Sequence, residues 1–563
     1  MSKVRIFALG GLDEDGKNMY VVQNNDDLFV MECGMKYPET GQLGVEMIIP
    51  DFRFLSENKD RIKGVFITHG HDDVMAALPS LLQELPKVPV YMAPLTALMF
   101  ERKAKKAGLR DLNIHRVMRN AHFKIGKTEI ITFGTTQSIA DGFGVAIKTA
   151  DGYVVYSSEF IVDYDTKNEA FRMDITNITN LGSNGVLALM CESVGSTRAG
   201  HSSPSHKISP VIEPYFENTK GRMFITLFNQ NIYRVIEVIE LANKYNRRVM
   251  IYDTELRELM NDMAKLGYYH IPAGLEVAQS SFTNDLENVL IIIAGTGSSI
   301  FRKVHRIASH EDDRIELRNS DTVIIASPAV PGTEREEAVM EDDLYKEAGR
   351  VLTVDSKRMF SMHASIEDLK MMIYLMKPKY YIPVKGEYRQ LIANANIALD
   401  MGYSAANIIV MDNGQVAEIN DGVLARSFDE VPVDNIMVDG NDKLDESGMI
   451  LKDRELLSTD GAIVVGIVIN HGTKEIIGGP DVQSRGVIYL KDADYIVKEI
   501  GNIMERTIDE AVAATDALDG IAAARDSAAV RAMADQARGS TLLAAGDAGA
   551  AVDREAGLAA GEV

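Results

Sequence analysis

The sequence predicts a large protein of layered α/β architecture with several domains. Short β-branched runs alternate along the chain with segments of helical periodicity, and strands joined by helices form layered α/β folds. At 563 residues the chain is too long for one hydrophobic core, so two to four domains are expected. A stretch rich in Ser, Pro and Gly at 195–210 and a polar, glycine-containing stretch at 439–446 mark boundaries between them.

The runs predicted as strands are most regular before the first boundary. There they cover residues 4–9, 65–68, 88–92, 129–133, 145–148, 153–156 and 186–190. Pro89 lies in the third run, and a residue without an N–H is tolerated mainly on an edge strand, so this strand is expected at a sheet edge. Later runs at 224–227, 249–252, 289–293 and 322–326 are followed by a predicted helix at 366–376 and a strand ending at Lys385.

Composition and charge favour a cytoplasmic protein without a membrane segment. The two cysteines cannot form a disulfide framework, and the chain shows no N-terminal signal and no apolar run of 18 residues. The net charge of −23 argues against a broad basic face, although a local groove can be positive in an acidic protein. The basic clusters at 102–106 and 302–303 are either candidates for such a groove or ordinary solvated helix faces.

The loop at 68–74, Thr-His-Gly-His-Asp-Asp-Val, contains candidate metal ligands. Two histidines at i and i+2 on a loop that leaves a buried strand can converge on one metal ion, and a carboxylate two residues on can reach a second ion. Val74 stands where such a loop would supply a third imidazole, and valine binds no metal. The alternative is a polar loop whose side chains are satisfied by hydrogen bonds.

Four segments carry a family pattern. A His-x-His-x-Asp-His motif is kept at 69–74 except for Val74, and the others read Gln-Ser-Ile-Ala-Asp at 137–141, Ser-Glu-Phe at 158–160 and Lys-Pro-Lys-Tyr-Tyr-Ile-Pro-Val-Lys-Gly-Glu-Tyr-Arg at 377–389. In these segments, and from about residue 3 to about residue 510, the chain resembles the ribonuclease J family of metallo-β-lactamase-fold, β-CASP ribonucleases. In that family the last block has histidine in place of Lys385.

The resemblance implies an α/β fold in which a metallo-β-lactamase αββα sandwich carries an inserted β-CASP parallel-sheet domain and is followed by a small α/β C-terminal domain. The expected divisions are 1–204 and 359–440 for the sandwich, 205–358 for the β-CASP domain, 441–450 for a linker, 451–510 for the C-terminal domain and 511–563 for an alanine-rich tail. This tail is not expected to supply the last strand of the C-terminal domain; it is read as a foreign terminus or as an interaction segment.

The resemblance also implies a metal site that is degraded. His69, His71 and Asp73 are kept as ligands, and Glu159 stands in place of a bridging aspartate, whereas three other ligand positions are changed to Val74, Gln137 and Lys385. Zinc or manganese occupies the site in the family, and here at most one weakly bound ion is expected. Lys385 could replace the missing cation between Asp73 and Glu159, or it could point to solvent.

Residues expected to act on RNA follow from the same resemblance. The catalytic candidates are Asp73, Glu192 and His363, and the candidates for contact with the RNA backbone are Asn229, Gln230, Asn231, Arg234, Ser361 and His363.

The loss of several ligands on a preserved scaffold is similar to the degenerate second paralogue of bacteria with two ribonucleases J. The resemblance implies a weakly active or inactive subunit that binds single-stranded RNA in rRNA maturation and mRNA decay. Its expected partners are an active ribonuclease J paralogue or a second copy of the chain. The alternative is an active metal-dependent 5′–3′ exoribonuclease and endoribonuclease. A non-catalytic architectural subunit and a hydrolase for a different phosphoester differ from it in their expected metal content.

Overall fold

A computed structural model describes residues 2–39, 42–297, 299–329, 333–355, 361–425, 429–440, 442–443, 449–470, 473, 475–485 and 493–514. The chain divides into a large compact unit, residues 1–40 and 44–444, and a small one, residues 41–43 and 445–563. No helix among the described residues is long and apolar enough to cross a bilayer.

Two β-sheets face each other in the large unit. One has the strand order β20-β19-β1-β2-β3-β5-β6-β7 and the other β18-β12-β11-β10-β9-β8. The strands of the first are β1 (Lys3–Gly10), β2 (Met19–Asn24), β3 (Asp27–Met31), β5 (Ile62–Ile67), β6 (Val90–Met92), β7 (Ile114–Arg116), β19 (Ala417–Asn420) and β20 (Val423–Leu424). Those of the second are β8 (His122–Ile125), β9 (Thr128–Gly134), β10 (Phe143–Thr149), β11 (Gly152–Tyr156), β12 (Val186–Glu192) and β18 (Tyr380–Val384).

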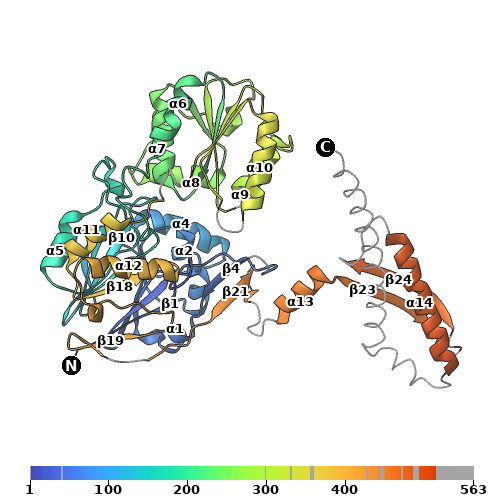
Figure 1. Ribbon diagram of the computed structural model, residues 1–563, viewed down its shortest axis with the longest axis horizontal. Coiled ribbons are helices and arrows are strands. Elements are labelled where there is room, and N and C mark those ends of the chain that lie inside the picture. The colour runs from blue at the N-terminus through green and yellow to red at the C-terminus, as the bar shows by residue number, and fades with distance from the viewer. Residues whose placement is uncertain are drawn as a thin grey trace, which may run out of the picture. The chain divides into compact units, whose positions relative to one another are not determined.

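The alternation of side chains along the strands produces the layers. On β1, Ile6 packs in a hydrophobic cluster shared with β10 and β18, whereas Phe7 packs in a cluster on the opposite face. Successive residues of a strand point to opposite faces, so one sheet is buried on both sides. Helices α3 and α4 pack on the outer face of the first sheet, and α5 and α11 on that of the second (Figure 1). The expected αββα sandwich is therefore confirmed.

The helices of this sandwich are short and mostly connect strands. They are α1 (Arg53–Glu57), α2 (Asp72–Met75), α3 (Leu78–Glu84), α4 (Pro94–Lys106), α5 (Ile175–Ser183), α11 (Ile366–Met376) and α12 (Tyr388–Asp400), with 3-10 turns at Lys59–Arg61, Glu169–Phe171 and Ala405–Asn407. All strands expected before residue 195 are present, but the sequence analysis missed β2, β3, β7 and β8. The edge position expected from Pro89 is wrong, because β6 pairs with β5 and β7 and Pro89 lies just before it.

A separate parallel sheet forms the inserted domain, as expected. Its strand order is β14-β15-β13-β16-β17, and only β17 was not expected from the sequence. The strands are β13 (Met223–Phe228), β14 (Arg248–Ile251), β15 (Val289–Gly295), β16 (Thr322–Ile325) and β17 (Arg350–Thr353). The connecting segments are α6 (Ser209–Asn218), α7 (Ile232–Lys244), α8 (Thr254–Lys265), a 3-10 turn at Gln279–Ser281, α9 (Ser299–Ala308) and α10 (Glu334–Glu347).

Two smaller sheets complete the described chain. In the large unit, β21 (Asn435–Asp439) pairs with β4 (Met47–Pro50) and β22 (Asp442–Lys443). The small unit contains α13 (Met449–Thr459), the hairpin of β23 (Ala462–Ile469) and β24 (Ile476–Arg485), and α14 (Ala493–Ala514). The expectations about the tail concern residues 511–563, of which 515–563 lie outside the described residues.

Candidate metal centre

Loops that follow three strands bring the candidate ligands together. The loop after β5 supplies His69, His71 and Asp73, the loop after β11 supplies Glu159, and the turn after β18 supplies Lys385. The backbone is unusual here, since Ser158 and Lys385 have φ angles of +59° and +57°. Non-glycine residues adopt such angles at a cost, and they cluster at functional sites because the surrounding fold enforces them.

Hydrogen bonds orient both imidazoles toward a common point. Thr68 Oγ1 lies 2.9 Å from His69 Nδ1, and Ser138 Oγ lies 2.8 Å from His71 Nε2. The remaining nitrogens, His69 Nε2 and His71 Nδ1, lie 3.1 Å apart. Hydroxyl partners on the outer nitrogens fix ring orientation in the way that partners of metal-bound histidines do.

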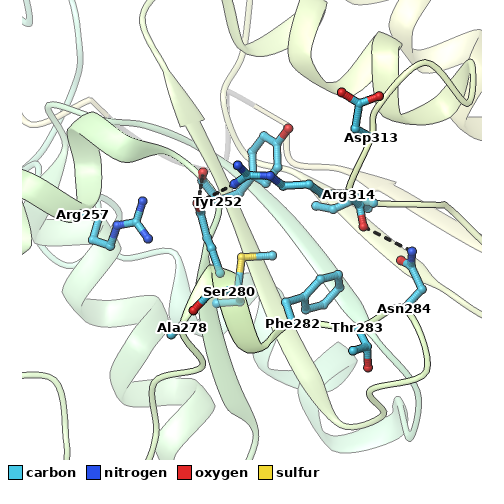
Figure 2. A pocket seen from close by; sticks show the side chains of 12 residues that line it. Tyr252, Arg257, Ala278, Ser280, Phe282, Thr283, Asn284, Asp313 and Arg314 are labelled. Atoms are coloured by element: carbon cyan, nitrogen blue, oxygen red, sulfur yellow. Dashed lines mark hydrogen bonds between the residues drawn. The ribbon is translucent and has the colours of Figure 1, made fainter.

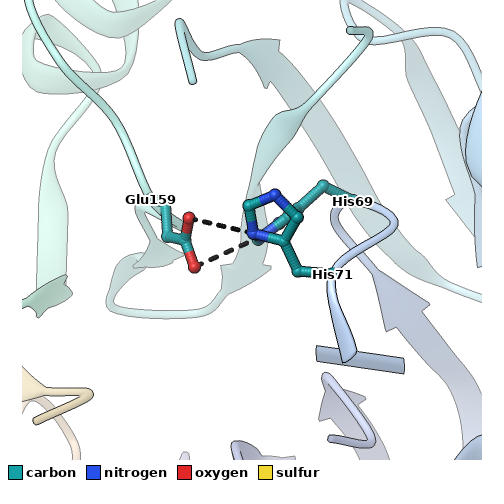
Figure 3. A group of neighbouring side chains, drawn as sticks. All are labelled: His69, His71 and Glu159. Carbon is teal, nitrogen blue, oxygen red and sulfur yellow. Dashed lines mark hydrogen bonds and ion pairs between the residues drawn. The ribbon is translucent and has the colours of Figure 1, made fainter. Parts of the chain in front are cut away.

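Glu159 faces the inner nitrogens of the two histidines. Its carboxylate oxygens lie 3.3 Å from His69 Nε2 and 3.5 Å from His71 Nδ1 (Figure 3). Burial lowers the pKa of His69 to about 4, so at neutral pH this imidazole is in the uncharged form that binds metals. The ligand atoms of these three residues all lie within 4.8 Å of one another. This set fits one metal ion.

Lys385 occupies the other side of Glu159. Its Nζ lies 2.6 Å from Asp73 Oδ2 and donates a second hydrogen bond to Glu159 Oε1. Burial opposes ionisation of all three groups, but the Coulomb attraction between them is stronger: the pKa of Lys385 is raised, and the pKa values of Asp73 and Glu159 are lowered. Lys385 is thus paired inside the protein and does not point to solvent.

The other two altered positions provide no strong ligand. Val74 is fully buried in the hydrophobic cluster beneath the loop. The Gln137 amide is also buried, and neither its oxygen nor its nitrogen has a hydrogen-bond partner among the described residues. A neutral amide oxygen is a weak ligand for a zinc-type ion. The donor set therefore fits one ion and does not fit a pair, because the second position would hold two carboxylates and an ammonium group.

A second acidic pair lies beside this centre. Glu192 Oε2 lies 2.7 Å from His363 Nδ1, while Glu192 Oε1 accepts hydrogen bonds from the backbone N–H groups of Phe160 and Ala364. Burial opposes protonation of His363, but the carboxylates of Glu192 and Glu159 outweigh it and raise its pKa. Of the catalytic candidates, His363 and Glu192 thus form one hydrogen-bonded pair and Asp73 belongs to the pair with Lys385.

Several residues of the centre were not found from the sequence as site residues. Asn18 donates a hydrogen bond of 3.0 Å to Asp73 Oδ2, and Thr68 donates from its backbone and its hydroxyl to the buried Glu32. Ser138 was quoted only as part of a motif. Single polar residues beside apolar runs are too common to be recognised, so only the position of Thr68 directly before His69 gave a usable signal.

The candidates for RNA contact are placed less uniformly. Ser361 is exposed, and its hydroxyl accepts a hydrogen bond of 2.8 Å from Arg198. Asn231 caps α7 by accepting from the Arg234 N–H, and Arg234 itself is only 5% exposed, with its guanidinium against the His206 carbonyl oxygen. Asn229 and Gln230 follow β13, where Asn229 donates to Glu255 at 3.4 Å. Buried Arg234 therefore offers little surface to RNA.

Comparisons with known proteins agree with this fold and site. Family models match residues 12–158 (metallo-beta-lactamase superfamily), 220–344 (ribonuclease J, beta-CASP domain), 349–406 (Zn-dependent metallo-hydrolase RNA specificity domain) and 449–538 (ribonuclease J C-terminal domain). The last match extends beyond residue 510, where the resemblance was expected to end. The chain is thus a metallo-β-lactamase-fold protein with a β-CASP insertion, and these domains imply a metal ion.

Full-length relatives define the family. The chain is 33% identical to "Ribonuclease J2" of Bacillus subtilis over 90% of this chain and 91% of that protein, and 31% identical to "Ribonuclease J 2" of Staphylococcus aureus over 88% and 89%. It belongs to the ribonuclease J family, whose members support a function in RNA processing. A crystal structure of a protein of unknown function from Enterococcus faecalis shares the fold alone, with a TM-score of 0.52, 14% identity and coverage of 74% of this chain and all of that one.

Proposed function

We propose that this chain acts in rRNA maturation and mRNA decay as a weakly active or inactive, RNA-binding subunit of a ribonuclease J complex. The observation that carries this proposal is the position of the Lys385 ammonium group between Asp73 and Glu159. Cleavage by a two-metal hydrolase requires cations that lower the pKa of water and clamp the phosphate oxygens. An ammonium group supplies one positive charge and hydrogen bonds, but no coordination position for water.

The remaining residues have defined roles in this proposal. His69, His71 and Glu159 would hold a single zinc or manganese ion, which would supply Lewis acidity there. Asp73 is neutralised by Lys385, and Glu192 holds the His363 imidazole by the hydrogen bond to Nδ1. His363 and Ser361 would donate hydrogen bonds to an RNA phosphate, together with Asn229 and Gln230 from the β-CASP domain.

A comparison of metal content and cleavage tests the proposal. Purified chain should contain at most one weakly held equivalent of zinc or manganese, and cleave a 5′-monophosphorylated RNA far more slowly than an active ribonuclease J. The variant V74H/Q137H/E159D/K385H should bind two ions, whereas K385H alone should gain little, since a chelate requires several ligands at once. Two tightly held ions in the unaltered chain, or cleavage at the rate of the active paralogue, would overturn the proposal.

The second candidate function is an active metal-dependent 5′–3′ exoribonuclease and endoribonuclease. One observation favours it: both histidines are already oriented for a metal, and Glu192 and His363 remain paired beside them. Cleavage that depends on added manganese and is abolished by His69→Ala would favour this alternative. Cleavage that persists in His69→Ala would instead indicate a contaminating nuclease.

A further inference from the structure

A pocket in the β-CASP domain lies outside the metal centre and is not used by the proposed function. It has a volume of about 620 Å³, within the range of small-molecule sites. Its walls come from the ends of β14 and α8, from the segment around the 3-10 turn Gln279–Ser281, and from the loop before Ile315 (Figure 2). It thus lies at the carboxyl end of a parallel strand, the end at which open α/β sheets bind ligands.

Two arginines from different elements line this pocket. Arg257 extends from α8 and Arg314 from the loop before Ile315, and Figure 2 shows both side chains at the cavity. Arg314 donates a hydrogen bond of 2.9 Å to Gln279 Oε1, and the Gln279 amide donates in turn to the carbonyl oxygens of Ile251 and Tyr252. Arg314 is therefore tethered to the end of β14.

Arg257 differs from other arginines of the same domain. Arg222 forms an ion pair with Asp321, and Arg318 forms one with Asp285. The half-buried guanidinium of Arg257 makes no hydrogen bond or ion pair within the part of the chain that the structure describes. In a chain with 82 acidic and 59 basic residues, leaving a partly desolvated cation without an acidic partner favours an external anion.

The rest of the lining indicates what accompanies the anion. Phe282 and Met250 contribute apolar surface, and the Ser280 and Thr283 hydroxyls lie on exposed backbone beside them. An aromatic ring beside arginine groups is the usual combination for a base and its phosphate. Asp313 is the only acidic residue of the lining, so the two arginines leave the pocket with a net positive charge.

We propose that this pocket binds a nucleoside monophosphate unit, either as a free nucleotide or as one nucleotide of an RNA chain. Arg257 and Arg314 bind the phosphate, and Phe282 stacks on the base. The site is separate from the metal centre, so nucleotide bound here leaves the residues around Lys385 unoccupied.

Binding of AMP and of a short single-stranded RNA to the full-length chain tests this site. Arg257→Gln and Arg314→Gln should each weaken binding of at least one of the two by ten-fold or more, because each removes a charge-assisted hydrogen bond. A loss confined to AMP identifies a free nucleotide, and a loss confined to RNA identifies a unit of a longer chain. Arg335→Gln on α10, where the arginine is exposed, is the matched control and should leave both affinities unchanged.

Photo-crosslinking locates the bound base independently of affinity. 8-Azido-AMP, or RNA carrying 8-azidoadenosine, should label the peptide that contains Phe282, and Arg257→Gln should remove this label while thermal stability stays the same. Absence of label at this peptide, or equal weakening by the Arg335→Gln control, would overturn the inference. Label found only on peptides near His363 would overturn it too, while leaving the proposed RNA-binding function intact.

Discussion

At the scale of single residues, Lys385 performs the charge balance that a cation would otherwise supply. Glu159 is 3% exposed and Asp73 lies beside it, so both carboxylates depend on the ammonium group. Removing one partner of a buried ion pair leaves an uncompensated charge, which commonly costs several kcal/mol. The centre therefore combines a metal-binding half, built from two histidines, with a half that is closed by a lysine.

Lys385→Gln should lower the free energy of unfolding by about 3 kcal/mol at neutral pH, for the reason just given. Manganese should restore part of this loss, because a divalent cation can take the position of the ammonium group, and it should stabilise the variant more than the parent chain. Denaturant unfolding with and without manganese measures both effects. The control is Lys63→Gln, whose pair with Asp27 is exposed and should change stability by no more than about 0.5 kcal/mol. A Lys385→Gln chain as stable as the parent would disprove the charge-balance argument.

Prediction from sequence works for ligands that are lost and fails for those that orient the ones that remain. Val74, Gln137 and Lys385 were recognisable because a motif fixes what should stand there. The support of His71 by Ser138 depends on a contact across 67 positions of the chain, which no local pattern encodes. Arg234 was expected at the RNA because of its charge, yet its position on the buried face of α7 decides its surroundings.

At the scale of elements, strands buried on both faces were recognised, and shorter or more polar ones were not. β10 and β12 have almost continuous apolar runs, whereas β8 alternates exposed lysine and histidine with half-buried residues and has only four positions. Pro89 misled because a proline just before a strand removes no hydrogen bond within the sheet. Its carbonyl oxygen still accepts from Val65 N–H at 2.9 Å, so the pairing with β5 begins at this residue.

The turn after β3 gives a pH-dependent contribution to stability. Burial raises the pKa of Glu32 from 4.5 to about 8, although Thr68 at the end of β5 donates two hydrogen bonds to its carboxylate. The folded state then binds this proton more tightly than the unfolded chain does. The contribution of Glu32 to the free energy of unfolding therefore falls as pH rises from about 4.5 to about 8.

Glu32→Gln should remove this fall, so the stability difference between variant and parent should grow in favour of the variant from pH 5 to pH 8. The slope should reach at most about 1.4 kcal/mol per pH unit. Urea unfolding at several pH values measures it, with Glu57→Gln as the control because Glu57 is exposed. Parallel pH profiles for Glu32→Gln and the parent would show that the carboxyl group does not titrate in this window.

At the scale of the whole molecule, a net charge of −23 limits how RNA can bind. Long-range repulsion opposes the approach of a polyanion, so binding must come from a few local contacts. Single-stranded RNA should therefore bind weakly, with an affinity that falls steeply between 50 and 200 mM salt, at about 0.7 in the logarithmic slope for each phosphate contacted. Filter binding at several salt concentrations measures this slope.

Ser361→Ala and His363→Ala should weaken RNA binding, because their side chains are the proposed donors to phosphate. Ser183→Ala, a hydroxyl removed from an exposed position at the end of α5, should have no effect. Affinity that does not change with salt would be incompatible with backbone contacts as the basis of binding.

Assembly is the property of the whole chain on which the proposed function depends. In the small unit, α14 packs against β24, and the hairpin also carries Val464, Val468 and Ile477, which are 65%, 57% and 63% exposed. Exposed apolar side chains grouped on one sheet are typical of an interface. Homologous chains commonly reuse one interface in self-pairs and mixed pairs. We therefore expect a self-dimer in isolation and a preferred complex with an active ribonuclease J.

Light scattering of the chain alone, of the active paralogue and of their mixture at micromolar concentration tests this expectation. The mixture should form a heteromeric species at the expense of both self-pairs, and Val468→Lys or Ile477→Asp should prevent it because a charge would be buried in the interface. Tyr374→Asp on α11 is the matched control, since it removes an equally exposed apolar side chain (68%) from the large unit. Two species that stay separate would rule out the complex, and loss of the complex in Tyr374→Asp but not in the hairpin variants would move the interface to the large unit.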